Sequence, residues 1–536
     1  MPATTNLPTM HTDDVRAHLR DGREIALIDL REEGPYSRSH PLFAVCVPLS
    51  RIETRILDLV PRRDVTIVLY DDGESFVARA APLLTRLGFS DIRVLEGGLE
   101  GWKTAGGELF RDVNVPSKAF GELVEHHRGT PSLPAEEVHA RIQRGENLVV
   151  LDARPFTEYE VMSIPGAVSV PGAELALRVR DLAPDPATTV IVNCAGRTRS
   201  LIGTQSLVNQ GIPNPVFALR NGTIGWTLAG NKLDHGAARR HPQASRQAQD
   251  EARARARALA DRAGVRRIDQ ATLDEWRAVP APDFTLYCLD VRDPAEFATS
   301  HLPGFRSAPG VQLVQATDEW VGVRHARIVL VDDDGVRAEM SAHWLTQLGW
   351  RDVFILDGVP LSGEAGIVPR RLPKVPHSAA REITLAELET LQAFGGMTLV
   401  DLATTKQFRA GHVPDAWFAL RADLGEIAEE ITEGPMVILS PCGSLAHFAA
   451  AEIASARLGE TLVLGGGTAT WKRAGLPLET DLDEGRALSS TDDLYKRPYE
   501  GTDNQHEAMQ AYLDWEFGLV AQLERDGTHG FKVLEA

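Results

Sequence analysis

The chain has few cysteines, and those it has are not paired. Its 536 residues include four, scattered at Cys46, Cys194, Cys288 and Cys442. This spacing indicates neither a disulfide framework nor a zinc site, so we expect no bound metal. The sequence also lacks any apolar run as long as a membrane span, and residues 1–14 have neither the basic nor the apolar region of a secretory signal. We therefore expect a cytoplasmic protein that does not contact a membrane.

Positive charge is also scarce. Lysine and arginine number 56 against 75 acidic residues, which gives a net charge of −19. Such an acidic chain is a poor candidate for binding nucleic acid. Its hydrophobic fraction of 43% and charged fraction of 24% are ordinary for a soluble globular protein. The chain is too long for a single core, and about three to five domains are expected.

One structural unit recurs four times along the chain. Each copy starts with an apolar strand that ends in an acidic residue, at 26–31, 149–154, 287–292 and 398–403. A second apolar strand then runs into a loop, at 66–73, 191–200, 328–335 and 437–443. Short apolar strands that alternate with amphipathic helices predict an α/β fold in which helices flank a mainly parallel sheet. Loops at the carboxyl ends of such strands are where ligands bind.

The four copies keep a nearly constant register. Their second loops begin 42, 42, 43 and 40 residues after the acidic residue, which places Asp71, Cys194, Asp333 and Pro441 at equivalent positions. Such agreement between four segments is hard to obtain by chance. We assign the copies to residues 8–112, 131–234, 266–370 and 382–480.

Two further segments lie outside the four copies. Residues 235–264 are rich in Ala, Arg, Gln and His, which predicts a helical linker. Residues 482–536 form a C-terminal extension in which a helix is predicted over 505–525. The apolar positions of this helix suit one buried face: Met509, Tyr512, Leu513, Phe517 and Leu519. We expect that face to pack on a neighbouring copy, with binding to a partner as the alternative.

The loop of the second copy carries the clearest chemical signal. A strand ends at Cys194, a tight loop with Gly196, Arg197 and Arg199 follows, and a helix is predicted from Ser200. A thiol at this junction lies among backbone N–H groups and at the positive end of a helix dipole. Both effects, with the arginines, favour the thiolate. The pattern is typical of a nucleophile that reacts with anions.

This loop resembles the active-site loop of rhodanese-type sulfurtransferases, and the four copies resemble four tandem rhodanese modules. In that family the cysteine takes up a sulfur atom, carries it as a persulfide and passes it on. Phosphatases with a similar loop have an arginine six positions after the cysteine, where this chain has Ser200. The last arginine here comes one position earlier, so the loop suits a single sulfur better than a phosphate. A phosphatase or arsenate reductase is the disfavoured alternative.

The resemblance implies a sulfurtransferase that works through a Cys194 persulfide. The sulfur would come from thiosulfate or a related anionic donor, and the acceptor would be cyanide, a thiol or a protein. No cofactor is implied. The substrate-binding residues implied are those of the loop: Ala195, Gly196, Arg197, Thr198, Arg199 and Ser200. Asp152 and Arg154, at the end of the neighbouring strand, would buttress the loop or serve the fold alone.

The other three loops are expected to be inert. A carboxylate cannot carry a persulfide, which excludes the loops with Asp71 and Asp333 from sulfur transfer. In the fourth copy Cys442 follows Pro441, and its loop has no arginine. We expect this thiol to be idle, with a reactive Cys442 that accepts sulfur from Cys194 as the alternative. Three degenerate copies in one chain also leave open a sulfur carrier or scaffold whose inert modules dock partners.

Overall fold

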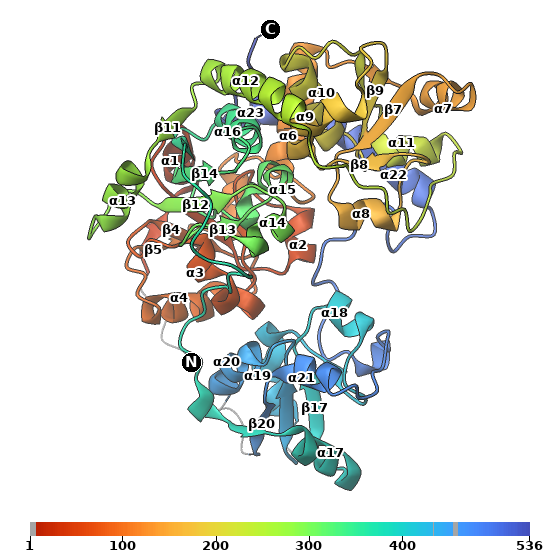
Figure 1. The fold of residues 1–536 in the computed structure, drawn as a ribbon. Coiled ribbons are helices and arrows are strands. Elements are labelled where there is room, and N and C mark those ends of the chain that lie inside the picture. The colour runs from red at the N-terminus through yellow and green to blue at the C-terminus, as the bar shows by residue number, and fades with distance from the viewer. Residues whose placement is uncertain (1–6, 432–433, 454–458, 536) are drawn as a thin grey trace.

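The chain forms four β-sheets of identical topology, and helices flank the sheets (Figure 1). The computed structural model describes residues 7–431, 434–453 and 459–535, so 432–433 and 454–458 of the predicted fourth copy and residue 536 of the extension lie outside the described residues. Each sheet has five strands, and the strand order is first, fifth, fourth, second, third in every case. All pairings between these strands are parallel. The prediction of four tandem α/β modules is confirmed.

Modules 1 and 2 contain the first two sheets. The elements of module 1 are β1 (Thr9–Met10), α1 (Thr12–Asp21), β2 (Ala26–Asp29), α2 (Glu33–Arg38), β3 (Val45–Cys46), η1 (Leu49–Thr54), α3 (Ile56–Leu59), β4 (Ile67–Tyr70), α4 (Phe76–Arg86), β5 (Ile92–Leu95) and α5 (Gly98–Thr104). Those of module 2 are β6 (Ser132–Leu133), α7 (Ala135–Gln143), β7 (Leu148–Asp152), α8 (Phe156–Val161), β8 (Val168–Ser169), α9 (Gly172–Leu182), β9 (Thr189–Asn193), α10 (Thr198–Asn209), β10 (Val216–Leu219) and α11 (Gly222–Leu228).

Modules 3 and 4 repeat this order. Module 3 has β11 (Arg266–Ile268), α13 (Gln270–Ala278), β12 (Leu286–Asp290), α14 (Pro294–Thr299), β13 (Arg306–Ser307), α15 (Gly310–Gln315), η2 (Thr317–Glu319), β14 (Arg327–Val331), α16 (Arg337–Gln347) and β15 (Val353–Leu356). Module 4 has η3 (His377–Ala379), β16 (Arg381–Ile383), α17 (Leu385–Phe394), β17 (Thr398–Asp401), α18 (Thr405–Ala410), β18 (Trp417–Phe418), η4 (Arg421–Asp423), α19 (Leu424–Glu430), β19 (Met436–Leu439), α20 (Ser444–Ile453), β20 (Thr461–Leu464) and α21 (Gly467–Arg473).

Helices also occupy the segments between and after the modules. α6 (Val115–Arg128) joins modules 1 and 2, and α12 (Arg246–Arg262) fills the second half of the predicted linker. The C-terminal extension begins with a short 3₁₀ turn, η5 (Glu484–Arg486). It then has two helices, α22 (Gln505–Phe517) and α23 (Leu519–Asp526), rather than the predicted single one.

The break between α22 and α23 at Gly518 separates two packing surfaces. Met509 and Leu513 of α22 pack on Ile224 of module 2. Leu519 and Leu523 of α23 belong to the apolar core that modules 1 and 3 share. The predicted burial of Phe517 is wrong, since this side chain is 54% exposed. One straight helix could not serve both surfaces, and glycine is a weak helix former at the break.

Modules 1 and 3 pack on each other although module 2 lies between them in the sequence. One apolar cluster contains residues of both sheets, such as Leu69 of β4 and Leu330 of β14, together with Phe120 of α6. Ile25 and Arg324 also form an isolated antiparallel bridge. The tandem order of the modules along the chain is therefore not their order in space.

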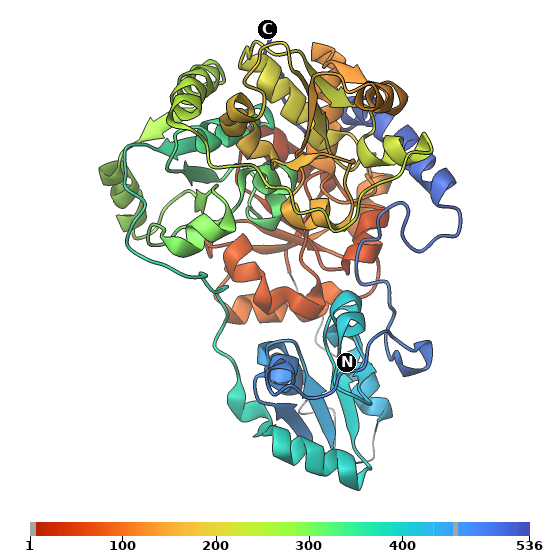
Figure 2. The same cartoon turned by 45° about the vertical axis from the view of Figure 1, so that its right-hand side comes forward.

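Module 4 stands apart from the other three (Figures 1 and 2). It has two apolar clusters of its own, one on each side of its sheet. Its contact with module 1 includes a buried ion pair in which Arg421 of η4 donates two hydrogen bonds to Glu53 of η1. Within the described parts of the chain, no helix is both long and apolar enough to cross a membrane.

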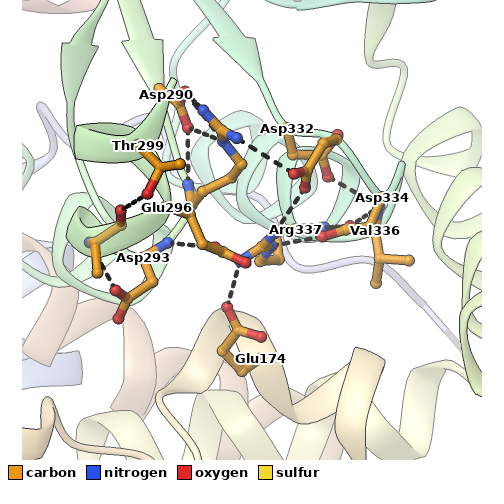
Figure 3. Close-up of polar contacts among 12 residues, drawn as sticks. Glu174, Asp290, Asp293, Glu296, Thr299, Asp332, Asp334, Val336 and Arg337 are labelled. Atoms are coloured by element: carbon orange, nitrogen blue, oxygen red, sulfur yellow. Dashed lines mark hydrogen bonds and ion pairs between the residues drawn. The ribbon is translucent and has the colours of Figure 1, made fainter. Parts of the chain in front are cut away.

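One buried arginine joins modules 2 and 3 (Figure 3). The Arg337 side chain, at the start of α16, is 2% exposed and lies among four carboxylates. It donates to Asp334 at 2.6 Å and to Asp333 at 2.9 Å within its own loop. A third bond, 2.7 Å long, reaches Glu174 of α9 in module 2. Arg337 therefore connects the loop of module 3 to its neighbour.

Replacing this arginine should destabilise the protein strongly. Arg337→Ala would leave buried carboxylates without a cation, and breaking a buried pair in this way costs about 3–5 kcal/mol. Arg257→Ala is the matched control, because its ion pair with Asp357 is half-exposed and should contribute about 1 kcal/mol or less. Urea unfolding followed by tryptophan fluorescence would compare the two. A loss for Arg337→Ala no larger than that for the control would contradict the assignment.

Candidate active site

Cys194 lies where the sequence places it, at the carboxyl edge of the second sheet. β7 and β9 are neighbouring parallel strands, and Asp152 is paired with Asn193 at their ends. Cys194 follows directly, and α10 begins at Thr198, two residues before the predicted start. The loop therefore connects the end of a buried strand to the N-terminus of a helix, as expected for an anion site.

The Cys194 thiol is buried, and burial opposes its ionisation. The residue is 2% exposed, and its Sγ lies 3.4 Å from Oγ of Ser200. Burial raises the pKa of the Cys194 thiol, while the charge of Arg199 and hydrogen bonds from Ser200 lower the pKa by less. Desolvation of the sulfur therefore outweighs the effect of the loop, which was expected to favour the thiolate.

Strand pairing corrects the register of two of the loops. The residues paired with Asp29, Asp152, Asp290 and Asp401 are Tyr70, Asn193, Val331 and Leu439. The next residues in the chain, which share the Cys194 position, are Asp71, Asp332 and Ser440. The assignments of Asp333 and Pro441 are each wrong by one residue. Residue counting assumes equal connections between strands, whereas the hydrogen-bonded register decides the position.

The loop N–H groups converge on the side chain at this position. Asp71 accepts bonds from the N–H groups of Gly73 and Val77, each 3.1 Å long. Asp332 accepts three, from Gly335, Val336 and Ala338, at 2.9 to 3.1 Å. Modules 1 and 3 thus hold a carboxylate of their own in the cradle that contains Cys194 in module 2. Neither loop has a thiol at this position, and the inertness expected of both loops stays a prediction.

Module 4 differs from both patterns. The hydroxyl oxygen of Ser440 accepts the N–H of Ala446, and Cys442 lies two residues further along the loop. The Cys442 side chain is exposed, and it does not occupy the position of Cys194. His447, on the helix that follows, approaches Glu382 and His377 closely enough for the three to hold a metal ion. Its Nε2 is 3.1 Å from a Glu382 oxygen, so an ordinary hydrogen bond accounts for the pair.

Both loop arginines are already paired with carboxylates. Arg197 donates to Glu122 of α6 at 2.6 and 2.9 Å and also bonds Glu125. Arg199 donates two bonds of 2.9 Å to Glu158 of α8. These bidentate pairs satisfy the two guanidinium groups that the sequence offers as binders of an anionic donor. None of these three carboxylates was identified from the sequence.

Asp152 and Arg154 hold the end of the strand before Cys194. Arg154 donates to Asp152 at 2.9 and 2.7 Å, and Asn193 donates to the same carboxylate at 2.8 Å. Both members of the ion pair are fully buried. The same pair recurs as Asp29 with Arg31 and as Asp290 with Arg292, in modules without the thiol. This recurrence favours a structural role over a chemical one.

The Cys194 loop opens into a cavity of about 230 Å³ that several parts of the chain build. Module 2 contributes the loop, and α6 and the C-terminal extension close the other sides. Lining residues that the sequence did not single out include Lys118, Glu158, Tyr495, Arg497 and Glu516, and Tyr512, predicted only as part of a buried helix face, also lines the cavity. The run of aromatic and basic residues at 495–499 was the available signal for the extension.

Glu516 is a buried acid beside the loop. Its side chain is almost fully buried, one oxygen accepts the Tyr512 hydroxyl at 3.0 Å, and the other oxygen has no partner. Burial raises the pKa of Glu516 to about 8, Lys118 lowers it, and Glu122 raises it. At neutral pH the carboxyl is therefore mostly protonated and adds little negative charge near Cys194.

Known proteins resemble the chain in sequence and in structure. The profile of the rhodanese-like domain matches residues 11–105, 134–229 and 272–358. A crystal structure of thiosulfate sulfurtransferase from Pseudomonas aeruginosa is 54% identical, with a TM-score of 0.95, and the match covers 99% of this chain and 100% of that one.

Two proteins of Mycobacterium tuberculosis are similar in sequence to shorter parts of the chain. An HTH-type transcriptional regulator is 32% identical over 111 residues, which are 20% of this chain and 48% of the regulator. The SseB protein is 29% identical over 124 residues, which are 21% of this chain and 43% of SseB. The chain thus spans less than half of the length of these two relatives.

The burial of Cys194 predicts slow alkylation. Iodoacetamide at pH 7.5 should label the exposed Cys442 well before Cys194, because Cys194 is shielded and the pKa of its thiol is raised. Timed quenching and peptide mapping by mass spectrometry would give both rates. In Cys442→Ser the fast adduct should disappear. Labelling of Cys194 as fast as that of Cys442 would contradict the burial described here.

Proposed function

Because this chain belongs to the rhodanese-like domain family, we propose that it is a sulfurtransferase whose second module carries the sulfur on Cys194. One observation carries the proposal: of the four equivalent loop positions, Cys194 alone bears a thiol. The thiosulfate sulfurtransferase similar to this chain over its full length supports thiosulfate as the donor. Persulfide chemistry also suits a reducing cytosol, where thiols stay free.

The reaction would proceed in two half-reactions. The Cys194 thiolate attacks the outer sulfur of thiosulfate, a sulfur–sulfur bond to the protein forms, and sulfite leaves with the electron pair of the broken bond. An acceptor then attacks the outer sulfur of the persulfide and releases the Cys194 thiolate. With cyanide as acceptor the product is thiocyanate. Covalent catalysis of this type predicts ping-pong kinetics.

The loop would hold the persulfide through its backbone. In modules 1 and 3 the equivalent N–H groups bind the carboxylates of Asp71 and Asp332. A persulfide on Cys194 places a negative charge close to the same donors, from Ala195 to Ser200. Oriented backbone donors stabilise such a charge without reorganisation. The inert loops therefore support the role proposed for the active one.

A sulfur carrier loaded by a partner protein is the second candidate. The raised pKa of Cys194 favours it, because a thiol that ionises reluctantly attacks thiosulfate slowly. The two candidates differ in turnover. An enzyme forms thiocyanate from thiosulfate and cyanide repeatedly, whereas a carrier becomes loaded once and turns over negligibly.

The Cys194→Ser variant should lose thiosulfate-dependent thiocyanate formation entirely, because serine cannot form a persulfide. Cys442→Ser, the matched control, should keep activity within about twofold of the unmodified chain. Intact-mass and peptide analysis after thiosulfate treatment should show one added sulfur on the Cys194 peptide, removable by cyanide. Normal turnover in Cys194→Ser would refute the proposal, and hydrolysis of an aryl phosphate would favour phosphatase chemistry.

Glu516 predicts a pH effect on loading. Above about pH 8 its carboxyl ionises, so an anionic donor should be repelled, and loading should fall relative to a chain that lacks this charge. The groups that face Glu516 are Lys118 and Glu122 of α6, Arg197 of the loop, and Tyr512 of its own helix. The ratio of the loading rates of Glu516→Gln and the unmodified chain should rise between pH 7 and pH 9. A constant ratio would contradict this role.

A further inference from the structure

We propose that Arg497 of the C-terminal extension binds the sulfonate end of the anionic sulfur donor above Cys194. This inference rests on the sulfurtransferase function proposed above and names the residue that selects an anionic donor. Arg497 lines the same cavity as Cys194 and Arg199. It comes from the extension and not from a rhodanese-like module.

The first argument is that both loop arginines already form ion pairs that maintain the structure of the loop. Arg199 and Glu158 form a bidentate pair, and Arg337 bonds Glu296 at the equivalent positions of module 3. Module 3 has a carboxylate in place of the thiol, so its Arg337–Glu296 ion pair has no sulfur donor to bind. A pair that persists in an inert module serves the conformation of the loop.

Arg197 has more partners than Arg199. Its guanidinium bonds Glu122, Glu125 and Asn221, and it lies 4.3 Å from the centre of the Phe517 ring. The side chain is 4% exposed. Binding a donor there would require an existing ion pair to break in a buried place, which is unfavourable.

The second argument is that the charge of Arg497 is not matched by a carboxylate. Among the residues that the structure describes, its guanidinium bonds only the Tyr499 hydroxyl, at 3.2 Å, and forms no ion pair. Glu158 and Glu500 act on its charge electrostatically, and Glu500 accepts the backbone N–H of Arg497 at 2.9 Å, but neither carboxylate forms an ion pair with the guanidinium. Arg497 is partly buried, where a charge acts more strongly than in bulk water.

The other cation of the cavity is less available. Lys118 forms an ion pair with Asp112, and its ammonium group lies 5.2 Å from the centre of the Tyr512 ring and 5.8 Å from that of Tyr495. Of the cations that line the cavity, Arg497 is therefore the most available to a sulfonate. Arginine suits this ligand because its planar fork can bond two oxygens at once.

The extension holds Arg497 in place by contacts with module 1. The Tyr495 hydroxyl donates to Asp112 at 2.9 Å, and the Tyr495 N–H donates to Glu33 at 3.2 Å. During loading, the bond between the two sulfurs of thiosulfate breaks and its electron pair leaves on sulfite. Arg497 would donate hydrogen bonds to those oxygens as their charge grows, and so stabilise the leaving group.

The test compares Arg497→Ala with Lys496→Ala, which removes the same charge one residue away at an exposed position. The second-order rate of persulfide formation from thiosulfate, followed by mass spectrometry, should fall about 10- to 100-fold in Arg497→Ala. It should stay within about twofold of the unmodified rate in Lys496→Ala. Arg497→Lys should recover part of the rate, because it restores the charge without the fork.

A second measurement separates donor binding from a structural role. Removal of sulfur from the loaded chain by dithiothreitol, an acceptor that has no sulfonate group, should proceed at the same rate in Arg497→Ala and the unmodified chain. Equal losses in loading and unloading, or no loss in loading, would overturn the inference.

Calorimetry of sulfite binding to Cys194→Ser tests Arg497 even if Cys194 never becomes loaded. Sulfite carries the same sulfonate oxygens as the donor, and this variant cannot form a persulfide. Adding Arg497→Ala should weaken sulfite binding about 10-fold or more, and unchanged affinity would overturn the inference. Failure of the proposed function would instead appear as an unmodified chain that thiosulfate does not load.

Discussion

A buried carboxylate at the end of one strand determines where each loop begins. In module 2 this group is Asp152, which accepts hydrogen bonds from Arg154, two residues later, and from Asn193 on the neighbouring strand β9. Asn193 directly precedes Cys194. Modules 1 and 3 repeat the aspartate–arginine pair. In module 4 Asp401 accepts the hydroxyl of Thr468 instead. Because a buried carboxylate must keep its partners, the strand ends stay aligned in all four modules while the loop residues vary.

That alignment gives the four loops a common position, at which the Cys194 loop alone has a thiol. Several loop N–H groups converge on the side chain at this position in modules 1 and 3, and in module 4 the N–H of Ala446 bonds Ser440 there. The side chain at this position is a carboxylate in modules 1 and 3. These modules contribute structure instead: they share a core, and Arg337 attaches the loop of module 3 to module 2. The loop that contains Cys194 thus lies in a module whose neighbour, module 3, has a carboxylate at the equivalent position.

Charge in the site is arranged in pairs that lie far apart in the sequence. Arg197 meets Glu122 from the preceding helix, and Arg199 meets Glu158 from within module 2. The C-terminal extension adds Glu516, whose raised pKa keeps it mostly neutral at pH 7, and Arg497, whose guanidinium bonds the Tyr499 hydroxyl. Among the described residues, Arg497 thereby offers an anion in this cavity a guanidinium that forms no ion pair.

The sequence by itself determined the four-fold repeat, the parallel α/β class and the position of Cys194 after a buried strand, because these follow from local periodicity and from residues adjacent in the chain. Tertiary structure alone decided the register of Asp332 and Ser440, which depends on hydrogen bonds between strands. It also decided that the loop arginines form ion pairs, whereas Arg497 forms none with the described residues. Those outcomes depend on contacts across many residues and on desolvation, and neither leaves a local pattern in the sequence.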